Sequence, residues 1–225
     1  MTGSGNGRRI IGAAFVSLDG VMQAPGGPEE DRRGSFPFGG WLAPLGDEAL
    51  GNQIATVLTP PYDLLLGRAT YEIFAAYWPF NQNAPDIAEP FNACRKYVMT
   101  RSDLPLDWNN SERVADLDAL AAIKAGEGPD IVIQGSSTLY PQLLQRGLID
   151  RLVLMTAPVV LGQGKRLLGD DCGPGTWRLV EQRTGSTGIV MSTYEPSGPV
   201  ETGGFGEAEA SRQEQARRER WQREG

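Results

Sequence analysis

The chain has 225 residues, of which 40% are hydrophobic, and it carries a formal net charge of −7 with no histidine. This size and composition suffice for one good α/β core and do not require a second domain. The acidic balance argues against nucleic-acid binding, because a phosphate backbone needs a clustered excess of Lys and Arg. The absence of imidazole excludes Ser-His-Asp hydrolases, HExxH zinc sites and histidine acid catalysis. Hydride transfer remains open, because a cofactor carries that chemistry.

Cys94 and Cys172 stand far apart and in no CxxC motif, so neither a disulfide framework nor a metal site is expected. The N-terminal residues lack the apolar region of a signal peptide, and no apolar run approaches the ~18 residues of a spanning helix. We therefore expect a cytoplasmic protein with no membrane or nucleic-acid partner. We expect a disordered N-terminus over residues 1–8, one domain over 9–196 and a polar, disordered or loosely helical tail over 197–225.

The first strand is expected from Arg9 to Val16, an apolar run that leads into a loop. Ala13 and Ala14 lie within it, and their small side chains suit either core packing or a flat ring against the strand backbone. Asp19 and Gly20 follow in a predicted turn, where Asp bonds the backbone and Gly adopts a positive φ. All four residues are candidates for cofactor binding.

The next segment, Gln23 to Gly40, is rich in Gly, Pro and charge, which is typical of a mobile cover over a ligand cleft. A helix is predicted from about Pro44 to Leu58, with apolar residues near one face. Asp47 falls in its first turn. We interpret Asp47 as a surface acid that complements the helix dipole rather than as a substrate ligand.

The segment LLLGRATYE, from Leu64 to Glu72, ends an apolar strand at a glycine and begins a helix at once. Gly67 lets an anion approach the backbone without a Cβ in the way, and the unpaired amides of a helix N-terminus face that anion. Arg68 adds a forked cationic donor and Thr70 a hydroxyl. The pattern predicts a phosphate-binding turn. The alternative is that Gly67 only ends the strand and Arg68 lies in solvent.

A short strand that begins at Lys96 is predicted to end in Thr100, Arg101 and Ser102. At the carboxyl edge of a parallel strand, two hydroxyls and a guanidinium suit the adenosine 2′-phosphate that distinguishes NADPH from NADH. Arg68 and Arg101 would then form a clamp from two strands. The alternative for each is an ordinary surface arginine.

A capped helix is predicted from Asp116 to Ala125, and a strand from Asp130 to Gln134. A second phosphate-binding turn follows, because a glycine admits a pyrophosphate while Ser and Thr supply hydroxyl and amide donors at a helix start. Its residues are Gly135, Ser136, Ser137, Thr138 and Leu139. The same residues fit a serine-capped helix without a ligand, so this turn alone does not distinguish a phosphate site from a helix cap.

A strand from Arg151 to Ala157 comes next, and the alternation over Trp177–Gln182 and Ser186–Tyr194 predicts an antiparallel hairpin that completes the sheet.

These segments resemble, in their order, the dihydrofolate-reductase-like superfamily, and most closely the reductase domain of riboflavin biosynthesis (RibD C-terminal domain-like). The motifs are GAAFVSLDG (12–20), LLLGRATYE (64–72), IVIQGSSTLYPQLLQRGLIDRL (131–152) and PVVLGQGKRLL (158–168). The resemblance implies an α/β three-layer sandwich, with a mainly parallel central sheet and an antiparallel C-terminal hairpin. It also implies NADPH as the cofactor and makes a homodimer plausible.

In the family, the pair matching Ala13 and Ala14 touches the nicotinamide carboxamide. The loop of residues 158–168 lies near the substrate in the riboflavin branch, where Lys165 or Arg166 either meets a ribose phosphate or lies in solvent. The sequence departs from the family in two places. Ser136 replaces the second of two adjacent glycines, and the predicted helix lacks the carboxylate that the folate enzyme places there.

We therefore expect an NADPH-dependent reductase of a small heterocyclic substrate, a ribosylaminopyrimidine such as 5-amino-6-(5-phosphoribosylamino)uracil or a related heterocycle. The alternatives are a reductase of dihydrofolate or of another carbonyl or imine, and, from a different class, a non-catalytic NADPH-binding or oligomeric scaffold. No catalytic residue is assigned from the sequence. Water or a carboxylate of the covering loop is expected to supply the proton.

Overall fold

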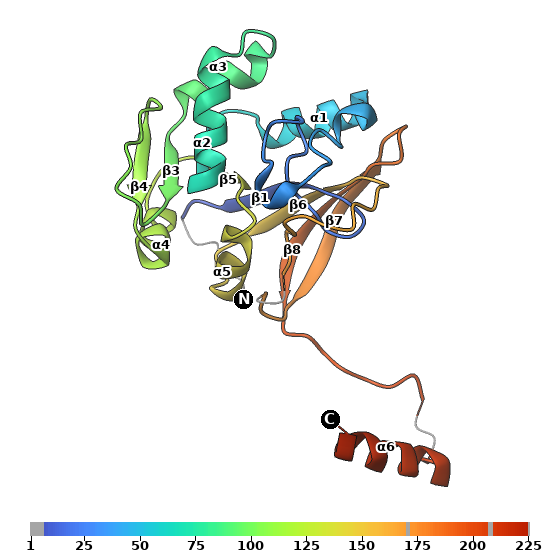
Figure 1. Ribbon diagram of the computed structural model, residues 1–225. Coiled ribbons are helices and arrows are strands. Elements are labelled where there is room, and N and C mark those ends of the chain that lie inside the picture. The colour runs from blue at the N-terminus through green and yellow to red at the C-terminus, as the bar shows by residue number, and fades with distance from the viewer. Residues whose placement is uncertain (1–6, 170–171, 207–208, 225) are drawn as a thin grey trace.

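The computed structural model describes residues 7–169, 172–206 and 209–224, and this part of the chain contains one eight-stranded sheet (Figure 1). Its parallel strands are β1 (Ile10–Val16), β2 (Tyr62–Gly67), β3 (Lys96–Met99), β4 (Ser111–Val114), β5 (Asp130–Gly135) and β6 (Arg151–Thr156). The antiparallel hairpin is β7 (Thr176–Thr184) and β8 (Val190–Gly198). The strand order is β4-β3-β2-β5-β1-β6-β8-β7, so the hairpin extends the sheet beyond β6. The predicted fold class is confirmed.

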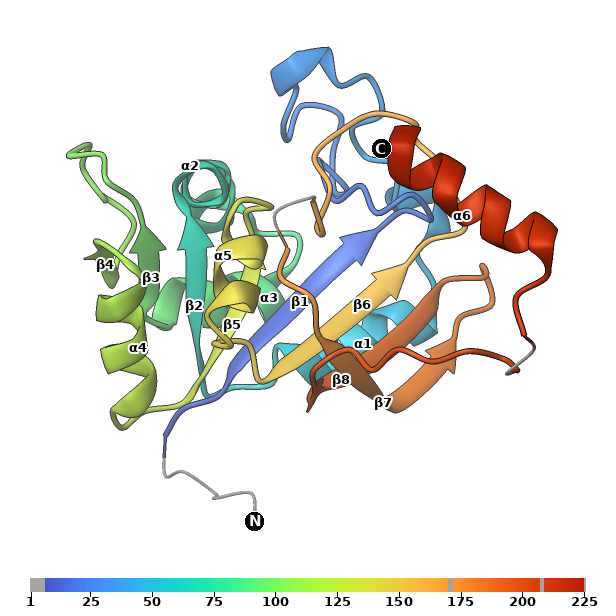
Figure 2. The ribbon, with the colours of Figure 1, turned by 90° about the horizontal axis from the view of Figure 1, so that it is seen from below.

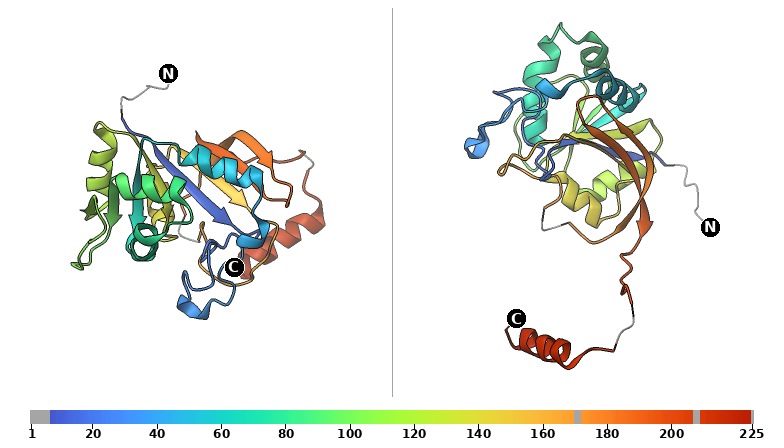
Figure 3. Two further views of the ribbon diagram at one scale, coloured as in Figure 1. Left: turned by 90° about the horizontal axis from the view of Figure 1, so that it is seen from above. Right: turned by 90° about the vertical axis from the view of Figure 1, so that its right-hand side faces the viewer.

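Helices cover both faces of the sheet. One face carries α4 (Leu117–Ala125) and α5 (Leu139–Gln145), and the other carries α1 (Glu48–Val57), α2 (Arg68–Tyr77) and α3 (Pro85–Ala93) (Figures 1 and 3). Figure 2, seen from below, shows α5 lying over β5 and β1. Short 3₁₀ turns span Arg33–Ser35, Ala43–Leu45 and Trp78–Phe80.

Each helical layer has its own apolar core. Leu120, Tyr140 and Leu143 of α4 and α5 are buried against one face of the sheet. Leu50, Tyr71 and Phe91 of α1, α2 and α3 are buried against the other face. Because β1, β2 and β5 are covered on both sides, they read in the sequence as nearly continuous apolar runs.

The helix predicted from Pro44 to Leu58 is wrong in its first turn. The chain makes a 3₁₀ turn that ends at Gly46, and α1 begins only after Asp47, whose carboxylate accepts a hydrogen bond from the Leu50 amide at 2.8 Å. The hydroxyl of Ser186 donates to the same carboxylate at 2.8 Å. The Leu50 amide and then Ser186 hold the pKa of Asp47 below its usual value. Asp47 is therefore a helix cap that also ties α1 to the β7–β8 turn.

The expected N-terminal boundary is also wrong, because Arg8 is buried. Its guanidinium donates to the carbonyl of Pro129 at 2.6 Å and to the hydroxyl of Tyr97 at 2.9 Å, and it pairs with Asp63. A forked donor that binds a partner through each of its three nitrogens fixes the chain to the end of the sheet before β1 starts. Most of the expected disordered N-terminus, residues 1–6, lies outside the described residues.

The polar tail forms a helix, α6 (Arg212–Glu224), that lies apart from the sheet (Figure 1). Its ion pairs are local, since Glu214 binds Arg217 and Arg218 in the i,i+3 and i,i+4 positions. Such pairs stabilise an isolated helix slightly, which composition alone does not reveal. No helix among the described residues is both long and apolar enough to cross a bilayer.

Lys96, the first residue of β3, has no exposed surface. Its ammonium donates to the carbonyls of Asn92 at 2.9 Å and Asn109 at 2.8 Å, and it lies 4.4 Å from the centroid of the Trp108 ring. Burial lowers the pKa of Lys96 to about 8. Two carbonyls and an aromatic face thus replace the water shell of the cation, and they join the end of α3 to the turn before β4.

We predict that Lys96→Met lowers the free energy of unfolding at pH 7 by about 1–3 kcal/mol, because two part-buried carbonyls lose their donor. The pKa of Lys96 lies below that of an unfolded lysine, so the unfolded chain binds more protons between about pH 8 and pH 10. The wild type therefore gains stability over the variant as the pH rises. Urea denaturation of both proteins at pH 7, 8.5 and 10 measures the gap, and a gap independent of pH contradicts the assignment.

We predict that ending the chain at Glu201 leaves the melting temperature and the elution volume, corrected for mass, unchanged. The contacts of α6 lie within the tail, whereas the carbonyl of Pro199 accepts a hydrogen bond from Thr176 and is retained. Thermal melting and sizing chromatography of the two chains test this expectation. A lower melting temperature or a smaller assembly would show that Phe205 or Trp221, both exposed here, docks on a partner subunit.

Candidate functional site

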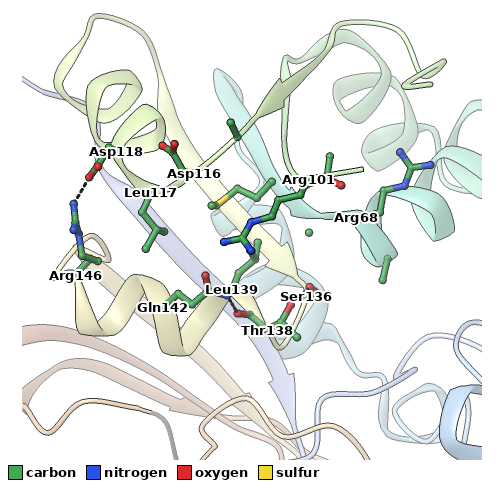
Figure 4. Close-up of a pocket in the computed structure, with 15 residues that line it drawn as sticks. Arg68, Arg101, Asp116, Leu117, Asp118, Ser136, Thr138, Leu139, Gln142 and Arg146 are labelled. Atoms are coloured by element: carbon green, nitrogen blue, oxygen red, sulfur yellow. Dashed lines mark hydrogen bonds and ion pairs between the residues drawn. The ribbon is translucent and has the colours of Figure 1, made fainter. Parts of the chain in front are cut away.

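A pocket of about 610 Å³ lies at the carboxyl ends of β2, β3, β4 and β5, between the N-terminal parts of α2, α4 and α5 (Figure 4). The carboxyl edge of a parallel sheet is the usual place for a ligand in this class of fold. The residues that line it are Gly67, Arg68, Ala69, Met99, Thr100, Arg101, Ala115, Asp116, Leu117, Asp118, Ser136, Thr138, Leu139, Gln142 and Arg146.

Two strand-to-helix turns interlock at the base of this pocket. A Cβ placed on Gly67 would lie 2.2 Å from the Ser136 hydroxyl, and a Cβ on Gly135 would lie 2.7 Å from the Thr70 hydroxyl. Gly135 also has φ +133°, a conformation that other residues rarely adopt. The glycines are thus required by the contact between the two turns, apart from any ligand. The predicted site residues Gly135 and Thr70 support the pocket from behind rather than line it.

The N-terminus of α2 opens onto the pocket. Gly67 is its cap residue, and among the described residues no side chain caps the first-turn amides. Unpaired amides at the positive end of a ten-residue helix favour an anion. Arg68, however, donates from Nε to Glu72 at 2.8 Å, so its charge is already matched by an acid on its own helix.

Arg101 reaches the pocket from the end of β3, and within the described part of the chain no acid pairs with it (Figure 4). The hydroxyl oxygen of Thr100 accepts the Ser102 amide at 3.0 Å, and that of Ser102 accepts the Leu104 amide at 3.2 Å. Each hydroxyl keeps its hydrogen for another acceptor. Thr100 and Arg101 therefore present donors to an anion, whereas Ser102 lies just outside the lining residues.

The second predicted phosphate turn lies directly beside the first, at the end of the neighbouring strand. The hydroxyls of Ser136 and Thr138 are 3.0 Å apart, and the Leu139 amide donates to the Ser136 carbonyl at 3.0 Å. All three residues line the pocket, but Ser137 does not. One of the two hydroxyls donates to the other, so the turn presents one free hydroxyl hydrogen to an anion and uses the Leu139 amide internally.

Sequence reasoning missed the far wall of the pocket. Arg146, the residue after α5, pairs through its guanidinium with the Asp118 carboxylate of α4, and the Gln142 side chain of α5 donates to the Thr138 carbonyl at 2.7 Å (Figure 4). Asp116 was predicted only as the start of a helix, and it caps α4 by accepting the Ala119 amide at 2.8 Å. These residues reach the pocket only because α4 and α5 pack beside each other, and no local sequence motif predicts that contact.

Ala13 and Ala14 are both buried, and each packs into a different core on opposite faces of β1. The Ala13 carbonyl accepts a hydrogen bond from the Tyr140 hydroxyl at 3.3 Å. Their side chains therefore follow the core-packing interpretation, and neither lines the pocket. A role at the nicotinamide stays a prediction.

Asp19 and Gly20 form a turn that closes onto the loop after β6. The Asp19 carboxylate accepts from the Ser17 hydroxyl at 2.7 Å and from the amides of Leu161 and Gly162 at 3.0 and 2.9 Å. These bonds, that of Ser17 first, lower the pKa of Asp19 to about 2. Gly20 has φ +78°, as predicted for the turn. Neither residue lines the pocket, so cofactor binding by this pair also stays a prediction.

The covering segment from Gln23 to Gly40 is held by buried contacts rather than left free. The Gln23 amide nitrogen donates to the carbonyls of Asp31 and Arg33 at 3.1 and 2.9 Å. The Lys165 ammonium pairs with the Asp31 carboxylate at 2.7 Å. Burial raises the pKa of Asp31, but hydrogen bonds from Arg33 and Lys165 outweigh it and bring the pKa to about 2. Lys165 is thus paired with the loop, although its side chain remains 38% exposed.

We predict that Gly67→Ala lowers the melting temperature and that adding Ser136→Gly to this variant restores most of the loss. The new Cβ would lie 2.2 Å from Oγ and 3.1 Å from Cβ of Ser136, and removal of that side chain relieves both contacts. Thermal melting of the single and double variants measures the coupling. Equal losses in both would mean that the Ser136 backbone, not its hydroxymethyl group, sets the clash.

The family model for the RibD C-terminal domain matches residues 8–191 of this chain. The chain is 31% identical over 204 residues to the uncharacterised protein YyaP of Bacillus subtilis, with 88% of this chain and 100% of YyaP covered.

Among solved structures, it is similar to a putative riboflavin biosynthesis protein from Shewanella sp. PV-4 (TM-score 0.63, 19% identity, 84% of this chain and 99% of that chain). It is also similar to a pyrimidine reductase-like protein from Corynebacterium diphtheriae (0.52, 15%, 84% and 92%) and to dihydrofolate reductase from Enterococcus faecalis complexed with NADP(H) (0.55, 16%, 84% and 96%). At these identities the structural likeness establishes the dihydrofolate-reductase-like fold, and the sequence match establishes that the chain belongs to the RibD C-terminal domain family.

Proposed function

We propose that this protein is an NADPH-dependent reductase of a small heterocyclic substrate. The observation that carries the proposal is Arg101, a pocket arginine without an acid partner among the described residues, placed beside Thr100 and across from the Ser136 turn. An acidic protein that leaves one guanidinium unmatched in a pocket favours an anionic ligand there. The family supports a reductase activity in general terms.

The pocket residues fit the adenosine end of NADPH. Met99, Leu117 and Leu139 supply apolar surface for a base, while Ser136 and Thr138 supply hydroxyls for phosphate oxygens. Arg101 and Thr100 are left to bind the 2′-phosphate. The neighbouring dihydrofolate reductase was solved with NADP(H), which supports the same choice of cofactor here.

When bound, the cofactor supplies a hydride, and the protein positions the acceptor carbon beside it. Asp19 and Asp31 have pKa values of about 2 and stay ionised at neutral pH, so neither is suited to donate the proton that completes the reduction. Burial raises the pKa of a third structured carboxylate, Glu30, which accepts hydrogen bonds from the amides of Gly26 and Gly27. We assign the proton to water or to Glu30.

The substrate proposed is a ribosylaminopyrimidine or a related heterocycle. The riboflavin and pyrimidine-reductase descriptions of two structural neighbours support this class. Dihydrofolate is disfavoured, because of the two acids at the start of α1, Asp47 is occupied by the Leu50 amide and the Ser186 hydroxyl, and Glu48 is exposed on the surface. A screen with pyrimidine and pterin substrates, in which turnover is measured as the loss of nicotinamide absorbance, tests the substrate class. Cofactor binding without any turnover would support a scaffold instead.

We predict that Arg101→Ala weakens NADPH binding about tenfold to a hundredfold and leaves NADH binding unchanged, since a lost charge-assisted contact costs about 1.5–3 kcal/mol. Arg113→Ala is the matched control. Arg113 is an exposed arginine of the neighbouring strand, donates to the Leu104 carbonyl at 3.0 Å and does not line the pocket. Titration of the wild type and both variants with NADPH and NADH by calorimetry gives the six affinities. Equal binding of NADPH and NADH by the wild type refutes the 2′-phosphate assignment.

A further inference from the structure

Arg68 lies on the pocket wall, but its charged group is turned out of the pocket. Nε donates to the Glu72 carboxylate at 2.8 Å, and Nη1 lies 3.4 Å from the carbonyl oxygens of Leu104 and Pro105. In Figure 4 the side chains of Arg68 and Arg101 point in opposite directions. The side chain of Arg68 is 22% exposed and that of Glu72 is 52% exposed. The guanidinium is thus held on the outer side of α2.

The position of Arg68 is electrostatically unfavourable for the helix that carries it. It is the first residue of α2, where the helix dipole repels a cation. An arginine four residues before a glutamate is also the weaker order for such a pair. An anion near the guanidinium offsets this repulsion, and Glu72 is the anion that the chain itself provides.

A phosphate entering the pocket would be a second anion within reach of the same side chain. Gly67 and Arg68 both line the pocket, so a rotation of the Arg68 side chain suffices to move its charge inward. The bond from Arg68 to Glu72 is exposed and therefore weak, and the contacts of Arg68 with the two carbonyls are long and also weak. Glu72 and the ligand thus compete for one guanidinium.

We propose that Glu72 is a positioning residue that sets cofactor preference by holding Arg68 away from the pocket. This inference rests on the proposed binding of NADPH. With Glu72 in place, Arg101 is the main cation for the 2′-phosphate, and Arg68 stays paired with Glu72 outside the pocket. The preference of the protein for NADPH over NADH is then lower than it would be if Arg68 and Arg101 both bound the 2′-phosphate.

The test is the substitution Glu72→Gln, which keeps the size of the side chain and removes its charge. We expect NADPH to bind about three- to tenfold more tightly, because Arg68 becomes free to join Arg101. NADH affinity stays within about twofold, since it lacks the 2′-phosphate. The gain in NADPH affinity shrinks as salt is raised from 50 to 500 mM, because salt screens the new contact.

Two further variants separate this role from a structural one. Arg68→Ala combined with Glu72→Gln removes the side chain that Glu72 is proposed to restrain, and we expect it to abolish the gain. Glu89→Gln on α3 removes one exposed carboxylate elsewhere and controls for the change in net charge; we expect no effect. Thermal melting of each variant confirms that it is folded.

The outcomes are distinct. A wild type that binds NADPH, with an unchanged NADPH affinity in Glu72→Gln, overturns the positioning role and leaves the proposed function standing. A gain that persists without Arg68, or that appears equally in Glu89→Gln, also overturns it. If neither the wild type nor any variant binds NADPH or NADH, the proposed function fails, and this inference fails with it.

Discussion

The close approach of two strand-to-helix turns is the constraint on which the candidate site depends. β2 and β5 are neighbours in the sheet, and at their ends Gly67 faces Ser136 while Gly135 faces Thr70. A larger residue at either glycine would occupy the volume of the other turn. The packing of each glycine against the hydroxyl side chain of the other turn therefore fixes the starts of α2 and α5 relative to each other. Donors that are fixed before a ligand arrives lose little freedom when it binds, which suits an anion site.

The distribution of charge around these turns, like their geometry, favours the binding of an anion at one place. Most cations near the strand ends are matched by an adjacent carboxylate, in the pairs Arg68–Glu72, Arg146–Asp118, Lys165–Asp31 and Arg166–Asp19. Arg101 has no such partner among the described residues. In a chain of net charge −7, an isolated guanidinium attracts an anion to one place, whereas the matched cations hold loops together.

The sequence predicts the sheet well, because apolar runs such as Leu64–Gly67 report burial directly and are confirmed as β2. It also places seven of the fifteen candidate residues on the pocket, since strand ends in a parallel sheet converge at one edge. It misses the Arg146–Asp118 wall, which arises from the packing of two helices. It misreads Arg8 as disordered, because burial of that side chain depends on Asp63 and Tyr97, far away in sequence.

The ordered contacts of the covering loops bear on the chemistry that the protein performs. Gln23 is buried and bonds to three backbone groups, so the loop keeps its shape without a ligand. Other bonds, those from Ser17 and Leu161 to Asp19 and those from Arg33 and Lys165 to Asp31, hold these two carboxylates in their ionised form. Burial instead raises the pKa of Glu30, which accepts the amides of Gly26 and Gly27. With no histidine in the chain, Glu30 is the carboxylate of this loop best suited to hold a proton, and the proposed reductase would rely chiefly on holding donor and acceptor carbons together.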